Sequence, residues 1–180
     1  MNRRHWGTAP ALAGWWGYDK DRQFDMAFDW QGAAGAGAWQ IGTPSLLGAA
    51  ALRGSLRVVE DAGGIDALRA RSLALTDFLI ACVEAAGLCG PEYGFAIGTP
   101  RDHARRGGHV AIEHEDADRI AKALKARGVI PDFRKPNVIR LAPAALYTGF
   151  GDIVEAVSHL QGIVDGGEHL AQAMGRERVA

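Results

Sequence analysis

The stretch from residue 93 to residue 164 alternates between two kinds of pattern, and this alternation constrains the fold more than any other feature of the chain. Short apolar runs are typical of strands, and amphipathic segments that end at glycine are typical of helices. The predicted order is strand, strand, helix, strand, strand, helix, over residues 93–98, 109–114, 115–127, 129–133, 138–142 and 152–164. This order indicates an α+β layer in which a small sheet is covered on one face. Ile120, Ala123 and Leu124 are expected on the inner face of the first of these helices.

Two longer helices are expected to precede this region. The first covers residues 45–61 and ends at the glycine pair 63–64. We expect it to start at Thr43 and Pro44, because the threonine hydroxyl can accept a hydrogen bond from an early backbone N–H and proline fits the first helical position. The second covers residues 65–86, where apolar residues recur at spacings of three, four and seven and so share one face. These residues are Ile65, Leu68, Leu75, Leu79, Cys82 and Ala86.

All five tryptophans lie in the first 39 residues, on a glycine-rich backbone that is typical of loops. One interpretation is that their rings are hydrophobic filler. Five such rings are hard to bury within so short a segment, so the alternative is a surface completed by missing chain, a partner or a flat ligand. We therefore expect residues 1–42 to be extended and poorly packed.

The composition argues against several classes of protein. With 48% hydrophobic residues and 20 basic against 21 acidic side chains, the chain is neither disordered nor a strongly basic nucleic-acid binder. Two cysteines are too few for a secreted disulfide framework, and no apolar run approaches the ~20 residues of a membrane span. A cytoplasmic protein without membrane contact is therefore expected. His109 and His114 are predicted on opposite faces of one strand, which argues against a shared metal.

Three features suit ligand binding. Gly-Trp-Trp-Gly at residues 14–17 places two large rings on a glycine-flanked turn. Gly-Thr-Pro at residues 42–44 places a hydroxyl and unpaired backbone N–H groups at a helix N-terminus, where an anion is favoured. Arg140 lies in an otherwise apolar strand. It either extends its charged head to solvent from an edge strand or holds a carboxylate by two parallel hydrogen bonds.

These motifs, in this order, resemble the C-terminal portion of kynureninase. The match extends from about residue 4 to residue 164, and it rests on the motifs at residues 14–17, 42–44, 63–65, 127–134, 137–143 and 146–147. Kynureninases are homodimeric pyridoxal phosphate (PLP) enzymes with the aspartate-aminotransferase fold, also called fold type I or class-V aminotransferase-like. The resemblance implies a remnant of the large PLP-binding domain over residues 1–42, two linking helices over 43–88, the small C-terminal α+β domain over 89–166 and a tail over 167–180.

The resemblance also implies a reaction and a set of site residues. Kynureninases hydrolyse L-kynurenine or 3-hydroxykynurenine between Cβ and Cγ, giving L-alanine and anthranilate or 3-hydroxyanthranilate, in tryptophan catabolism and NAD biosynthesis. By resemblance, Trp15 would contact the cofactor phosphate and Thr43 would do so across the dimer interface. Arg140 would hold the substrate α-carboxylate, and Trp16 and Gly42 would line the pocket for the aryl ring.

Two departures from the family pattern bear on activity. Tyr18 stands at a substrate-pocket position where the family usually has histidine, which leaves the preference between the two substrates open. The family's Schiff-base lysine, its aspartate facing the pyridine nitrogen and its ring-stacking aromatic residue all precede the tryptophan motif, and this chain begins fourteen residues before Trp15. The chain alone is therefore expected to be inactive. It is a truncated kynureninase, a non-catalytic subunit that pairs with a separate N-terminal half, or a relict.

Overall fold

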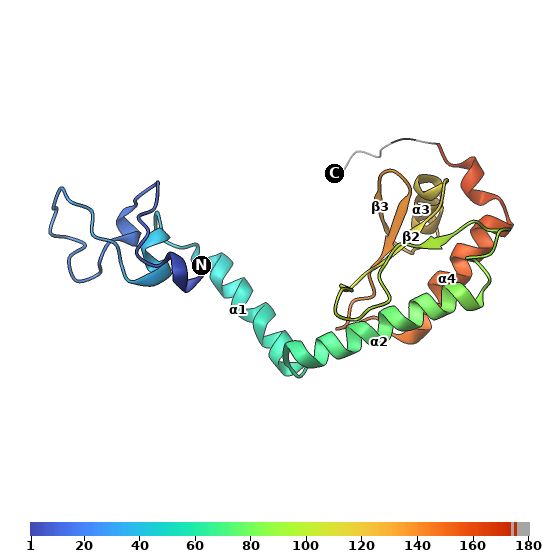
Figure 1. Ribbon diagram of the computed structural model, residues 1–180, viewed down its shortest axis with the longest axis horizontal. Helices are drawn as coiled ribbons and strands as arrows, with labels where there is room; N and C mark the ends of the chain where they lie inside the picture. The colour runs from blue at the N-terminus through green and yellow to red at the C-terminus, as the bar shows by residue number, and fades with distance from the viewer. Residues whose placement is uncertain (174, 176–180) are drawn as a thin grey trace. The chain divides into compact units, whose positions relative to one another are not determined.

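The computed structural model describes residues 1–173 and 175 of the chain. The chain separates into two compact units, Met1–Val58 and Val59–Ala180, which we call the first unit and the second unit. Figure 1 shows the course of each unit along the sequence. The predicted tail, residues 167–180, lies partly outside the described residues. None of the helices in the described part is both long enough and apolar enough to span a membrane.

The second unit is an α+β domain, as predicted. Its elements are α2 (Gly64–Ala85), β1 (Ala96–Ile97), β2 (Val110–Glu113), α3 (Ala117–Ala126), β3 (Asp132–Arg134), β4 (Val138–Leu141), α4 (Phe150–Asp165) and a short 3-10 helix (Glu168–Ala171). The four strands form one antiparallel sheet in the order β1-β2-β4-β3. Both β2 and β4 are thus interior strands, and β1 and β3 are the edges.

The helices cover one face of this sheet. On that face the cross-strand partners Val110 and Leu141, and Ile112 and Ile139, are buried together with apolar side chains of all three helices. Ile120, Ala123 and Leu124 lie in this core, which confirms the predicted inner face of α3. Because side chains alternate along a strand, the residues between these core positions lie on the other, open face of the sheet. Arg140 is one of them.

Several predicted boundaries are wrong, for identifiable reasons. The strand predicted over residues 129–133 begins only at Asp132. The Val129 N–H closes α3 by donating to the Leu124 carbonyl, with Gly128 in the left-handed region at φ +84°. Pro131 has no N–H to give to a sheet. The strand predicted over residues 93–98 is reduced to Ala96–Ile97, because the residues before it form a turn in which Gly94 has a φ of +70°.

The two predicted long helices form close to their expected limits, but two details differ. Helix α1 spans Leu46–Asp61, and Ser45, not Thr43, caps it: the Ser45 hydroxyl accepts from the Gly48 N–H at 3.2 Å. In α2 the predicted apolar face is buried only in its C-terminal half. Ile65, in the first turn, is 71% exposed.

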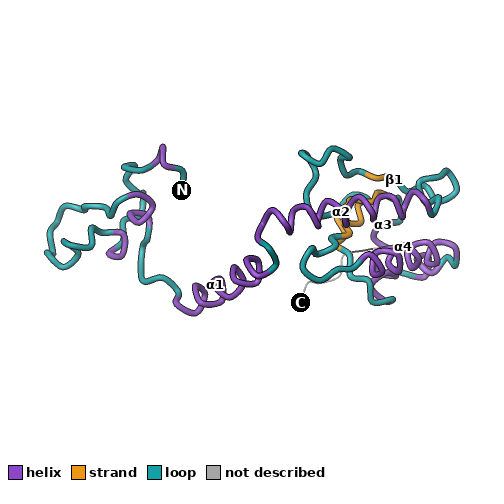
Figure 2. The backbone as a smooth tube through the Cα atoms, turned by 90° about the horizontal axis from the view of Figure 1, so that it is seen from below, coloured by secondary structure: helices purple, strands orange, loops and turns teal. Residues whose placement is uncertain are grey.

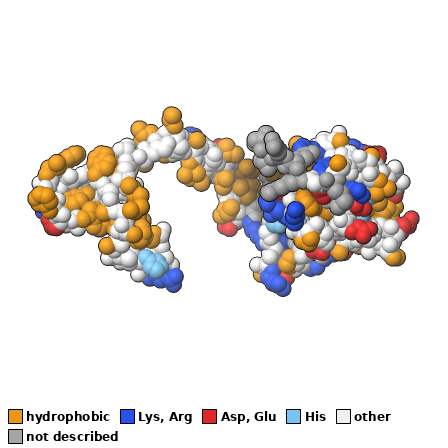
Figure 3. Space-filling model, turned by 90° about the horizontal axis from the view of Figure 1, so that it is seen from above, with side chains coloured by type: hydrophobic (Ala, Val, Ile, Leu, Met, Phe, Trp, Pro, Cys, Tyr) orange, Lys and Arg blue, Asp and Glu red, His pale blue; other side chains and the backbone are white. Residues whose placement is uncertain are grey.

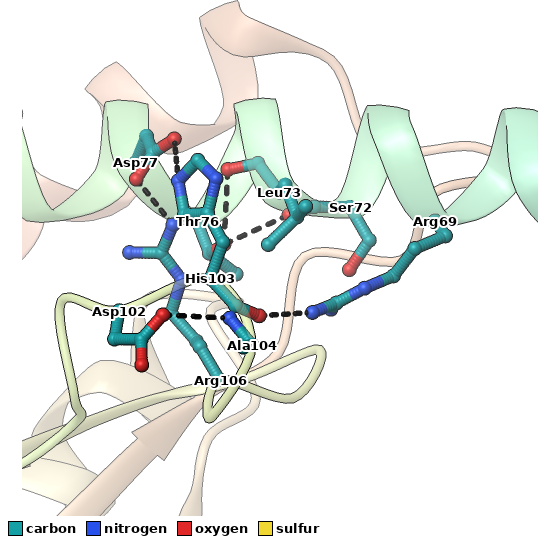
Figure 4. Close-up of polar contacts among 9 residues, drawn as sticks. All are labelled: Arg69, Ser72, Leu73, Thr76, Asp77, Asp102, His103, Ala104 and Arg106. Atoms are coloured by element: carbon teal, nitrogen blue, oxygen red, sulfur yellow. Dashed lines mark hydrogen bonds and ion pairs between the residues drawn. The ribbon is translucent and has the colours of Figure 1, made fainter.

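A polar cluster fixes the loop between β1 and β2 to α2 (Figure 4). The Asp77 carboxylate accepts from His103 Nε2 at 2.8 Å and from the buried guanidinium of Arg106. Arg69 donates to the His103 carbonyl at 2.5 Å. Burial raises the pKa of the Asp77 carboxyl, but the hydrogen bonds and charges of Arg106 and His103 outweigh it, so this pKa lies below its ordinary value. Breaking the cluster would leave the buried Arg106 charge without its carboxylate.

The first unit is mostly loop, as Figure 2 shows ahead of α1. It holds three 3-10 turns, Arg3–His5, Trp15–Gly17 and Gly35–Trp39, and most of α1. Among its residues only Gly17 and Ala38 are buried, so residues 1–42 are poorly packed, as predicted. They are not extended, because the segment folds back on itself where Tyr18 bridges to Gly32 and Gly14 approaches Ile41. Hydrophobic side chains cover much of this unit in the view of Figure 3. The exposed large hydrophobic side chains of this unit include Phe24, Met26, Phe28, Leu47 and Leu52.

Candidate functional site

The tryptophan turn is held by close backbone contact within the first unit. A Cβ built on Gly14 would lie 2.0 Å from the Ile41 carbonyl oxygen, and one on Gly17 would lie 2.5 Å from that of Ala38. Only glycine permits this approach at either position. The two glycines therefore bring the segment 14–17 against the segment 38–41, next to the Gly-Thr-Pro motif.

Trp15 and Trp16 present their rings differently. The rings meet edge to face with centroids 4.9 Å apart. Trp15 is 52% exposed, and its carbonyl accepts from Gln23 Nε2 at 2.9 Å. Trp16 is half-buried under Lys20, whose ammonium lies 4.5 Å from the centre of the Trp16 ring and also donates to the Trp16 carbonyl. The indole of Trp15 is thus the more open of the two to a ligand.

Tyr18 borders a shallow cavity beside this turn. Its hydroxyl donates to the Asp29 carbonyl at 3.0 Å. The cavity has a volume of about 320 Å³ and is lined by Trp15, Tyr18, Gln23, Met26, Ala27 and Phe28. Aromatic and apolar groups dominate the lining, with a few polar atoms, so a flat aromatic ligand matches it chemically.

Gly42 and Thr43 are exposed in the link between the tryptophan turn and α1. Thr43 lies before the helix rather than capping it, so the argument that made it a helix cap was wrong. It still lies close in sequence to the first turn of α1, where backbone N–H groups have no intrahelical partner. The hydroxyl of Thr43 is therefore not engaged in capping α1.

Arg140 lies in the second unit, on β4. Because β4 is an interior strand, the interpretation of an arginine on an edge strand was wrong. The Arg140 side chain is 33% exposed and forms an ion pair with the carboxylate of Asp132, its direct cross-strand partner on β3. Asp132 also accepts from Arg134 Nε at 2.9 Å. The structure thus supplies Arg140 with a carboxylate from its own chain.

Sequence reasoning missed three residues that contact the candidate site residues, two in the first unit and one in the second. Lys20 and Gln23 lie against the tryptophan turn, and the sequence pattern gave no indication of either contact. Asp132 could have been found: a hairpin that pairs Arg134 with Val138 must also pair Asp132 with Arg140. The structure brings Trp15, Trp16 and Tyr18 together within the first unit, and it places Gly42 and Thr43 in the same unit.

Comparison with known proteins extends these observations. The family model of the kynureninase C-terminal domain matches residues 68–160, which include Arg140 and Asp132. A kynureninase of Geobacillus thermodenitrificans is 47% identical over 180 residues, covering all of this chain and 41% of the relative. A kynureninase of Bacillus thuringiensis is 44% identical over the same shares of both proteins. One of Shouchella clausii is 46% identical over 164 residues, covering 91% of this chain and 37% of the relative.

The chain belongs to the kynureninase family and corresponds to its C-terminal portion. It spans about two fifths of the length of the curated relatives that it matches. The predicted family resemblance is therefore confirmed. The tryptophan turn and the Gly-Thr-Pro motif lie outside the segment matched by the family model, but they lie inside the region aligned with the first two relatives.

Proposed function

We propose that this chain provides the substrate-carboxylate site, the aryl pocket and part of the cofactor-phosphate site of a cytoplasmic kynureninase. The reaction is the hydrolysis of L-kynurenine or 3-hydroxykynurenine to L-alanine and anthranilate or 3-hydroxyanthranilate. The observation that carries the proposal is Arg140, a guanidinium on the open face of the sheet within a domain of this family. Its N–H groups form a planar fork that fits the carboxylate of an α-amino acid.

The donors in the first unit fit the phosphate of PLP. Trp15 has an open indole, Thr43 has a hydroxyl that does not cap α1, and the first turn of α1 adds backbone N–H groups. In kynureninases PLP supplies the electron sink that lets bonds of the amino acid substrate break. Within this proposal Trp15 and Thr43 hold the phosphate end, with Thr43 reaching it from the partner subunit of a homodimer.

The remaining residues of the proposed site bind the substrate ring. Within this proposal Trp16, Gly42 and Tyr18 contribute to the aryl pocket. Of the three, Tyr18 lines the cavity beside the tryptophan turn, and its hydroxyl is turned to the Asp29 carbonyl. Because the hydrogen of that hydroxyl is already donated to Asp29, Tyr18 offers a ligand its ring surface and an acceptor oxygen, but not a donor. Gly42 leaves room for a flat ligand, since a Cβ built there meets no atom within 4 Å.

The rest of the proposed site comes from polypeptide beyond this chain. The curated relatives are more than twice as long as the matched segment, and the first unit exposes large apolar side chains that a larger fold-type-I domain would cover. That polypeptide would supply the lysine that carries PLP. In the alternative, this chain is a non-catalytic subunit that pairs with a separate N-terminal half.

The test uses this chain joined to the preceding segment of the Geobacillus relative, which we call the joined protein. Kinetics with L-kynurenine should show that Arg140→Ala and Arg140→Lys each lower kcat/KM by about 100-fold or more, because two charge-assisted hydrogen bonds are lost or distorted. A lysine variant equal to the parent would reassign Arg140 to a structural role. If the two segments, made separately and mixed, release anthranilate, the split-enzyme alternative is favoured.

A further inference from the structure

The open face of the sheet carries a charged group of three residues from the β3–β4 hairpin. Asp132 and Arg140 are direct cross-strand partners, and Arg134 follows two positions after Asp132 on the same face. Arg140 Nη2 and Arg134 Nε both donate to one oxygen of Asp132, Oδ2. The carboxylate thus contacts two guanidinium groups and neutralises the charge of only one.

The contact between Asp132 and Arg140 leaves most of the guanidinium available. One carboxylate oxygen on one nitrogen occupies a single N–H of the five that arginine carries. A two-pronged edge of the fork stays open for a carboxylate from a ligand. Among residues 1–173 and 175, Asp132 is the acidic side chain paired with Arg140. Asp132 therefore holds Arg140 without competing for the whole of its fork.

This contact restricts a long side chain before any ligand arrives. An arginine on an interior strand can otherwise sample many rotamers over the open face, and fixing one of them on binding costs affinity. Asp132 lies on a neighbouring strand, and its own position is set by the register of the hairpin. The backbone pairing of β3 with β4 therefore determines, through Asp132, the orientation of the Arg140 guanidinium.

We propose that Asp132 is a positioning residue for substrate binding: it pre-orients Arg140 to receive the substrate α-carboxylate. This inference rests on the proposed function of Arg140 and adds to it a residue that itself touches no substrate. Asp132 acts on the binding of carboxylate-bearing ligands, and its contribution disappears for ligands that lack the carboxylate.

The experiment compares Asp132→Ala, Asp132→Asn and the control Arg134→Gln in the joined protein. Asp132→Ala should raise KM for L-kynurenine by about threefold to tenfold, the cost of ordering one long side chain. We expect kcat to change by less than about twofold. Asp132→Asn keeps an acceptor oxygen and should recover part of the loss. Arg134→Gln leaves the Asp132–Arg140 contact in place and should match the parent.

A second ligand separates positioning from folding. The decarboxylated analogue of kynurenine, used as an inhibitor, should bind the parent and Asp132→Ala equally well. Equal weakening of both ligands in Asp132→Ala would mean a merely structural role, and an unchanged or lowered KM for kynurenine would mean that Asp132 does not assist Arg140. Either result overturns the inference.

A spectroscopic measurement on the chain by itself tests the same contact without catalysis. In a ¹⁵N-labelled sample, the Arg140 Nε–H resonance, identified by its loss in Arg140→Lys, should shift in Asp132→Asn and not in Arg134→Gln. No shift in Asp132→Asn would overturn the pre-orientation. An unchanged KM in Arg140→Ala would disprove the proposed contact of Arg140 with the substrate. If the resonance shift is still seen in that case, the contact by which Asp132 orients Arg140 stands.

Discussion

The first unit buries two of its residues, whereas the second encloses a core of eighteen buried hydrophobic side chains. Both contain residues of the proposed site. The second unit holds Arg140 on a sheet that three helices cover, and its order comes from its own packing. The first unit holds the tryptophan turn on loops stabilised by a few hydrogen bonds and close glycine contacts. A site residue in the second unit is thus positioned by a packed core, whereas one in the first unit is positioned by local loop contacts alone.

The largest expected difference between the units is in the free energy of unfolding, when a leucine is replaced by alanine once in each unit. Leu124→Ala, at a fully buried position of α3, should lower the free energy of unfolding of the second unit by about 3 kcal/mol. Leu47→Ala, at a position of α1 that is 86% exposed, should change stability by less than about 0.5 kcal/mol.

Hydrogen exchange distinguishes the units in this experiment, because all five tryptophans lie in the first unit and fluorescence does not report on the second. The amide hydrogens of α3 should exchange faster in Leu124→Ala than in the parent. Their exchange rate should not change in Leu47→Ala. Protection of residues 1–42 equal to that of α3 in the parent would break the contrast.

The polar cluster on α2 should give the next largest effect. Asp77→Ala leaves the buried Arg106 guanidinium without its carboxylate and should cost about 2–3 kcal/mol at pH 7. The folded-state pKa of Asp77 is lowered, so its stabilisation is complete above the unfolded value of about 3.9 and is lost as pH falls through the folded value.

Denaturation at a series of pH values checks this expectation. The stability difference between parent and Asp77→Ala should shrink below about pH 4. Glu84→Gln, which breaks the exposed pair with Arg101, is the control and should cost less than about 1 kcal/mol. A pH-independent difference for Asp77→Ala would show that its charge is not what stabilises the loop.

The smallest effect concerns the start of α1. Ser45→Ala removes the observed cap and should destabilise the helix by about 1 kcal/mol, seen as faster exchange in its first turns. Thr43→Val should leave this exchange unchanged. For PLP binding in the joined protein, Thr43→Val should have the larger effect. It should weaken PLP binding by roughly tenfold or more, and Ser45→Ala should not. Equal effects of both variants on helix exchange would restore Thr43 as part of the cap.

The success of sequence reasoning follows the same division between the units. In the second unit the apolar pattern predicted α2, α3, α4 and the four strands, and Ile120 and Leu124 were placed correctly, because burial imposes a period. It missed the 3-10 helix Glu168–Ala171, which lies in the stretch predicted as tail. The wrong element boundaries lie where local backbone or capping hydrogen bonds override the hydrophobic pattern. Val129 looks like a strand residue but closes a helix, and Ser45 replaces Thr43 as the cap.

In the first unit the sequence predicted poor packing but not the contacts that exist. The ammonium of Lys20 over Trp16 and the approach of Gly14 to Ile41 follow from the path of the loops, which no periodicity records. The ion pair between Asp132 and Arg140 is an intermediate case. It required only the register of one hairpin, a quantity that strand prediction alone does not provide.

The β3–β4 hairpin has a consequence for how this protein can change by insertion or deletion. Three residues, 135–137, connect the paired positions Arg134 and Val138. One residue more or fewer in that connection would shift the pairing and bring a different side chain, Pro131 or Phe133, opposite Arg140. The length of a loop with no proposed ligand contact would then decide whether Arg140 faces a carboxylate. The effect of a length change in this loop is therefore set by the charges on the open face and by the packing of Phe133 against the core, and not by the loop's own exposure.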